Sequence, residues 1–199
     1  MAESLNKGWM DNPTRRTPLN TFKIAIIATL CALSIGTNYA LIGVSNIKFM
    51  DFIVFFGGFC FGSTVGASIG VLSWLIYGLI NPLGFVPQVW VATMFAESIY
   101  GLVGGVIGTK LRSSSFQGQR LRASVFFATV GFLPTVLYDL VTNIVYAFSF
   151  NVPLVVAVFT GAPMTVLHEV ANAAIFGVCT VPLISVLGRD IMRQRICPS

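Results

Sequence analysis

The sequence predicts an all-α integral membrane protein with six transmembrane helices and both termini in the cytoplasm. Of its 199 residues, 55% are hydrophobic and only 10% are charged, which is too few to cover a soluble globular domain. Eleven of the 12 Lys and Arg residues lie in three short stretches, within residues 7–23, 110–122 and 189–195, and long uncharged runs separate these stretches. Basic residues beside membrane spans favour the cytoplasmic side, so the net charge of +5 indicates orientation rather than a nucleic-acid-binding surface.

The first half of the chain is expected to cross the membrane four times. Residues 24–44 form one uncharged span, and residues 90–109 form another that returns to the cytoplasm at the second basic stretch. Because an even number of crossings must separate the first two basic stretches, the apolar run 52–80 must cross twice. This run has 29 residues, which predicts two short helices that turn near residues 62–64.

The second half of the chain is expected to cross twice more. Residues 123–187 have a basic stretch on each side, so they also cross an even number of times. Four turn-forming residues predict the break between these two helices: Asn151, Pro153, Gly161 and Pro163. The predicted organisation is a cytoplasmic tail of residues 1–21, a six-helix membrane domain of residues 22–188, a cytoplasmic tail of residues 189–199, and outer loops at about 44–51, 81–89 and 149–162.

Four ionisable residues lie inside the predicted spans: Glu97, Asp139, His168 and Glu169. Such residues are functional candidates, because a carboxylate at the centre of a membrane helix costs about 2.5–3.5 kcal/mol. At 1.5 Å per residue they lie roughly 8–13 Å below the outer ends of their helices. Residues three or four positions further on share their helix faces, namely Tyr100, Asn143 and Asn172. Three helices thus place polar side chains in one layer, which predicts a pocket open to the outside.

Two other interpretations of these residues stay open. The polar side chains could bond to one another and tie the last three helices together without binding a ligand. The sequence from His168 to Asn172 also resembles the H-E-x-x-H zinc motif of metalloproteases, but asparagine replaces the second histidine and His168 is the only histidine of the chain. A metal site is therefore not expected, and an intramembrane metalloprotease is the least favoured alternative.

Six stretches of the sequence carry a resemblance to a known family. They are NIKFMDFIVFFGGFCFG at residues 46–62, VGASIGVLS at 65–73, NPLG at 81–84, AESIYGLVGG at 96–105, YDLVTN at 138–143 and HEVANAAIFG at 168–177. With these motifs the chain resembles the substrate-binding S component of energy-coupling factor (ECF) vitamin transporters. The resemblance covers nearly the whole chain beyond residue 20, and its motifs follow the order found in the family.

The resemblance implies a six-helix protein of the cell membrane that captures a vitamin or related micronutrient from outside. It also implies partners: a transmembrane coupling subunit and two cytoplasmic ATPase subunits, which use the ATP. This chain has no Walker motif, so it is not expected to hydrolyse ATP itself. The resemblance implies a binding subunit that is not an enzyme and binds no cofactor. The alanine motif by which the family docks on the coupling subunit matches Ala28 and Ala32 in the first helix.

The residue pattern and the resemblance together predict the site. The expected substrate-binding residues are Glu97, Tyr100, Tyr138, Asp139, Asn143, His168, Glu169 and Asn172. Lys48 and Asp51 are expected to form a lid in the first outer loop, where Lys48 is the only cation and could contact a carboxylate or phosphate. The carboxylates and amides suit a donor-rich or cationic ring better than a small carboxylate. The alternative function is an autonomous ion- or proton-coupled secondary transporter, in which Asp139, His168 and Glu169 relay protons.

Overall fold

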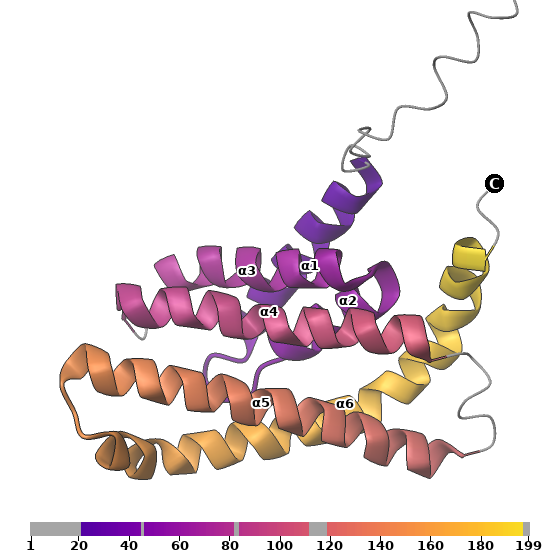
Figure 1. Cartoon of the computed structure of the whole chain (residues 1–199). Coiled ribbons are helices and arrows are strands. Elements are labelled where there is room, and N and C mark those ends of the chain that lie inside the picture. Colours follow the sequence, from indigo (N-terminus) through magenta and orange to yellow (C-terminus); the bar gives the residue numbers. More distant parts are fainter. Residues whose placement is uncertain (1–20, 45, 82–83, 112–118, 197–199) are drawn as a thin grey trace, which may run out of the picture.

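The computed structural model describes residues 21–44, 46–81, 84–111 and 119–196, with side chains described up to residue 186 (Figure 1). Every regular element in this part of the chain is an α-helix. The helices are α1 (Thr21–Ala40), α2 (Met50–Phe61), α3 (Ser63–Leu79), α4 (Pro87–Lys110), α5 (Arg120–Phe150) and α6 (Leu154–Ile196). Almost all of the predicted N-terminal tail, and most of the connection between α4 and α5, lie outside the described residues.

The prediction of two short helices within the apolar run 52–80 is confirmed. Helix α2 has 12 residues and α3 has 17, and Gly62 alone separates them. Gly62 has a φ of 99° and a ψ of 160°, a backbone conformation that glycine adopts without a steric penalty. The other four helices are each long and apolar enough to cross a membrane. This architecture is compatible with a multi-pass membrane protein.

The prediction of an outer loop at residues 149–162 is wrong, because the break between the last two helices is much shorter. Helix α5 ends at Phe150, Asn151 follows in the left-handed conformation with a φ of 56°, and α6 begins at Leu154. Gly161 and Pro163 lie inside α6. Membrane helices tolerate glycine and proline within a helix, because neighbouring groups can satisfy the backbone atoms that proline leaves unbonded. Helix α6 also continues to Ile196, so most of the predicted C-terminal tail 189–199 is helical.

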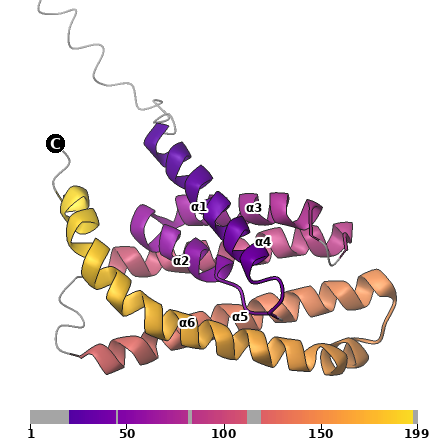
Figure 2. The same cartoon turned by 180° about the vertical axis from the view of Figure 1, so that it is seen from behind.

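The helices form two layers, with α1–α4 in one and α5 and α6 side by side in the other (Figures 1 and 2). Helix α1 crosses its layer obliquely. The start of α1, the end of α4, the start of α5 and the end of α6 all lie toward the right of Figure 1. We call this the basic end of the bundle, because Lys23, Lys110, Arg120 and Arg122 belong to these helix ends.

Glycines allow α2, α3 and α4 to pack with their backbones in contact. A Cβ atom added to Gly66 of α3 would lie 2.5 Å from the Cα of Gly58 in α2 and 2.7 Å from the Cα of Gly101 in α4. One helical turn away, a Cβ on Gly70 would lie 3.0 Å from the backbone of Glu97. Close packing of this kind holds helices together where lipid removes the hydrophobic driving force between them. It also fixes the position of Glu97 relative to α3.

Replacing Gly101 with alanine is expected to destabilise the protein by about 1–3 kcal/mol, because the new methyl group would overlap the backbone of Gly66. The matched control is Gly36→Ala in α1, where no atom lies within 4 Å of the added Cβ. That control should be neutral or slightly stabilising. Thermal unfolding of both variants in detergent checks the prediction, and equal melting temperatures would contradict the close contact of α3 and α4.

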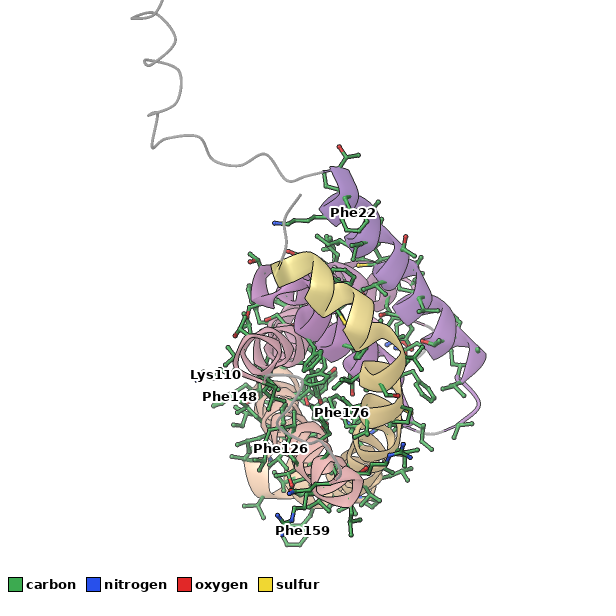
Figure 3. The ribbon with its side chains drawn as sticks, turned by 90° about the vertical axis from the view of Figure 1, so that its right-hand side faces the viewer. Phe22, Lys110, Phe126, Phe148, Phe159 and Phe176 are labelled. Atoms are coloured by element: carbon green, nitrogen blue, oxygen red, sulfur yellow. The ribbon has the colours of Figure 1, made fainter. Side chains whose placement is uncertain are left out.

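Large apolar side chains cover the outside of the bundle. Phe148 is 82% exposed and Phe159 is 77% exposed, and both lie at its edge when it is viewed from the basic end (Figure 3). Phe176 instead points into the middle of the bundle and is fully buried. A soluble monomer rarely exposes apolar patches of this extent, whereas lipid accommodates them.

Candidate binding site

A buried polar cluster lies between the two layers, and Asp51 is at its centre. Asp51 belongs to the first turn of α2 and is 1% exposed. Its Oδ2 atom lies 2.7 Å from Nε2 of His168 and accepts a 2.6 Å hydrogen bond from Nδ2 of Asn172. Both partners are on α6, so Asp51 joins the first layer to the second. Its placement corrects the prediction that Asp51 belongs to the outer loop and forms part of a lid.

His168 lies between two carboxylates. Its Nε2 faces Asp51, and its Nδ1 lies 3.1 Å and 3.2 Å from the two carboxylate oxygens of Asp139 on α5. An ionised carboxylate only accepts hydrogen bonds, so both contacts are satisfied when the imidazole carries both of its protons. A neutral imidazole satisfies them if one of the two acids is protonated. Either way, the group of His168, Asp51 and Asp139 retains one proton that a neutral imidazole with two ionised carboxylates would lack.

Asn172 extends the cluster from α6 toward α4 and α5. Its amide nitrogen donates to Oγ1 of Thr135 at 2.8 Å as well as to Asp51. The hydroxyl of Thr135 also accepts a 2.8 Å hydrogen bond from the Tyr100 hydroxyl and donates to the backbone oxygen of Gly131 at 2.7 Å. The donor and both acceptor positions of that hydroxyl are therefore in use. Thr135 holds Tyr100 and Asn172 in fixed positions.

Glu97 and Asn172 each retain a buried oxygen with no hydrogen-bond donor near it among the described residues. Glu97 is fully buried on α4, and its Oε2 accepts a 3.1 Å hydrogen bond from Nε1 of Trp74 on α3. Its Oε1 has no donor, and neither does Oδ1 of Asn172. Buried polar atoms are almost always paired, so each such atom calls for an explanation, and a ligand is one. The carboxyl group of Glu97 also interacts with that of Asp51, and a proton shared between the two acids is a second explanation for the unpaired Oε1.

The loop between α1 and α2 lines an open cavity of about 390 Å³, which reaches Trp74 of the cluster but is not lined by Asp51, Glu97 or His168. Six residues line it with polar or aromatic groups: Asn38, Asn46, Lys48, Trp74, Tyr77 and Asn81. Asn46 donates a 2.7 Å hydrogen bond to the backbone oxygen of Met164, which fastens the loop to α6. The ammonium group of Lys48 lies 5.5 Å from the ring centre of Trp74 and 5.7 Å from that of Tyr138. The volume falls within the usual range of small-molecule sites.

Six of the eight predicted binding residues meet in this cluster: Glu97, Tyr100, Tyr138, Asp139, His168 and Asn172. The other two do not. Asn143 is half-buried and donates to Thr165 at 3.4 Å, one turn further along α5. Glu169 is partly exposed and forms no hydrogen bond with the described residues of the cluster. Lys48 lies in the loop as predicted.

Trp74 and Thr135 belong to the cluster but were not predicted. Thr135 precedes Asp139 by four residues, so it shares a helix face with Asp139, and this spacing was available in the sequence. Trp74 gave no signal of its own, because a tryptophan within an apolar helix usually serves for packing.

The hydrogen bonds of the cluster match both interpretations of the polar layer, because they also tie α2, α4, α5 and α6 together. Among the described residues five buried polar atoms have no hydrogen-bond partner, and two of them belong to this cluster. Together with the neighbouring cavity, which Trp74 and Lys48 line, they favour a binding site over a purely structural role. No group of three or more His, Cys, Asp or Glu side chains in the described part of the chain has an arrangement suited to a metal ion. No protein-family model, curated protein or solved structure matches this chain.

Proposed function

We propose that this chain is the substrate-capture subunit of an ATP-driven ECF uptake transporter, and that it binds a vitamin or related micronutrient from outside the cell. The observation that carries this proposal is the buried polar cluster, which shares Trp74 with the lining of the cavity beside the loop between α1 and α2. The cluster uses side chains from α2, α4, α5 and α6, and two of its acceptors have no donor. The sequence resemblance to S components supports the same function.

In this proposal α1 docks on the transmembrane coupling subunit, which works with two cytoplasmic ATPases. Ala28 and Ala32 are both exposed on one face of α1, and Gly36 continues that face with open space beside it. A row of small residues lets a partner helix approach closely within lipid. The chain itself would bind no cofactor, and the partner subunits would hydrolyse the ATP.

We further propose that the protein spans the cell membrane six times, with both termini and the basic end of the bundle in the cytoplasm. In a cysteine-free variant, a cysteine introduced by Gly84→Cys should react with an impermeant reagent added outside intact cells. A cysteine introduced by Phe116→Cys should react only after the cells are opened. External labelling at position 116 would contradict the proposed orientation.

A proton-coupled secondary transporter is the second candidate, and the geometry of His168 favours it. The ring lies between Asp51 and Asp139, and the three groups hold one proton more than a neutral imidazole with two ionised carboxylates would hold. Ionisable groups of this kind form the proton relays of pumps and transporters. Such a transporter would move its substrate without any ATPase.

The first experiment asks whether the isolated chain binds a small molecule. The protein is purified in detergent, the bound molecules are released by denaturation, and mass spectrometry identifies them. A capture subunit should release about one molecule of a single compound per chain and should rebind it without any partner. The absence of any bound or rebinding molecule would contradict the proposal.

A further inference from the structure

The ammonium group of Lys48 occupies a position that has the properties of a cation site. It lies over the ring of Trp74 at 5.5 Å and over that of Tyr138 at 5.7 Å. Its charge also acts on the carboxylates of Asp51 and Glu97. Two aromatic faces with carboxylates nearby form the kind of cage that holds ammonium and amidinium groups.

The walls of this cage are held in place. Nε1 of Trp74 donates to Glu97, and the backbone oxygen of Trp74 accepts a 3.1 Å hydrogen bond from Nε1 of Trp90. On the other side, Tyr138 packs edge-on against the ring of His168, with ring centres 5.7 Å apart. Lys48 is the exception, because it comes from the loop between α1 and α2 and is only partly buried. It can therefore leave the cage while the walls stay where they are.

The charges and unpaired atoms around the cage favour a ligand that donates hydrogen bonds. Glu97, Asp51 and Asp139 are three acidic groups beside two basic ones, Lys48 and His168. If Lys48 leaves, one basic group, His168, remains beside the three acids. The fully buried Oε1 of Glu97 is an acceptor without a donor, and an N–H group of a ligand would satisfy it.

We propose that Trp74, Tyr138, Glu97 and Asp51 form a binding site for a cationic aromatic ring that carries N–H donors, and that Lys48 occupies this site as a tethered substitute until the ligand displaces it. The ring stacks on Trp74 and Tyr138, and its N–H groups donate to Glu97. This inference rests on the proposed capture function and names its substrate class. This role is the reverse of the one expected from the sequence. Lys48 was expected to contact a carboxylate or phosphate of the ligand, whereas here it competes with the ligand for the site.

The test uses three probes with the same ring and different charge: benzamidinium, benzamide and benzoate. Each is titrated by calorimetry into the full chain purified in detergent. Benzamidinium should bind, benzamide should bind more weakly, and benzoate should not bind. Replacing Glu97 with glutamine should weaken benzamidinium binding by about 10- to 100-fold, because the charged acceptor is lost.

The deciding variant is Lys48→Met, which keeps a long, unbranched side chain and removes its charge. It should tighten benzamidinium binding by about 2- to 30-fold, which corresponds to the loss of a competing cation–π contact. Lys48→Arg keeps the competing cation and should stay close to the unsubstituted protein. Lys110→Met, at the far end of α4, is the control for loss of a positive charge and should change nothing. Melting temperatures confirm that the variants are folded.

Three outcomes would overturn the inference. Benzoate could bind in preference to benzamidinium and lose affinity in Lys48→Met, which would make Lys48 an anion contact. Lys48→Met could leave benzamidinium binding unchanged, or none of the probes could bind to the folded protein. An anionic ligand would overturn the substrate class only, because ATP-driven uptake of that ligand would still establish the capture function. Tight binding of benzamidinium without ATP-driven uptake would support the substrate class and overturn the capture function.

Discussion

Replacing Asp51 with alanine is expected to lower the free energy of unfolding by about 3–5 kcal/mol, because one partner of a buried charged network is removed while the others remain. The variant would leave Nε2 of His168 without its partner at 2.7 Å and would remove the acceptor of the 2.6 Å bond from Asn172. These two contacts join α2 to α6, so the two layers should separate more easily. Asp51→Asn keeps an acceptor oxygen and should cause a smaller loss.

Glu169→Ala is the matched control for this experiment. Glu169 is also an acid next to the cluster on α6, but it is partly exposed, so its replacement should change stability by no more than about 0.5 kcal/mol. Thermal unfolding of the three variants in one detergent gives the comparison. If Asp51→Ala has the same melting temperature as Glu169→Ala and the unsubstituted protein, Asp51 does not hold the layers together.

Replacing Ala28 or Ala32 with tryptophan is expected to abolish uptake by the complete transporter while the isolated chain still binds its ligand. Both alanines are exposed on α1, and an indole ring there would prevent close approach of a partner helix. The cluster around Asp51 and Glu97 involves no residue of this exposed face. Binding should therefore keep its affinity, and co-purification with the coupling subunit should be lost.

Leu33→Trp separates docking from a general effect of added bulk. Leu33 lies on the same helix and is 51% exposed, but its side chain is already large and points away from Ala28 around the helix. Uptake by Leu33→Trp should stay close to that of the unsubstituted protein. If Ala28→Trp lost ligand binding and folding together, the exposed alanine face would pack within the protein and would not serve as a docking surface.

The sequence was sufficient to locate the polar residues at the centre of the molecule. Ionisable side chains are expensive in an apolar helix, so Glu97, Asp139 and His168 stood out, and helical spacing added Tyr100 and Asn172. The turn at residues 62–64 could also be predicted, because a run of 29 apolar residues between two basic stretches is expected to fold back on itself.

The remaining features depend on contacts that spacing does not reveal. Asp51 was predicted to be the last residue of an outer loop and part of a lid. Helix α2 begins at Met50, so Asp51 lies in its first turn and at the centre of the network. Trp74 resembles a packing residue until its indole is seen to bond to Glu97. Gly161 and Pro163 suggested a loop, but α6 continues through them, and Gly161 instead provides space for Asn143 of α5.

Uptake into proteoliposomes tests the capture function most directly. The chain is reconstituted with its coupling subunit and two ATPases, and accumulation of the ligand identified by mass spectrometry is followed. Uptake should require ATP and all partner subunits, and it should stop when the ATPases are inactivated. The chain reconstituted alone should bind the ligand at the vesicle surface without accumulating it, even when a pH gradient is imposed. Accumulation by the chain alone, driven by the pH gradient, would contradict the capture function and establish a secondary transporter.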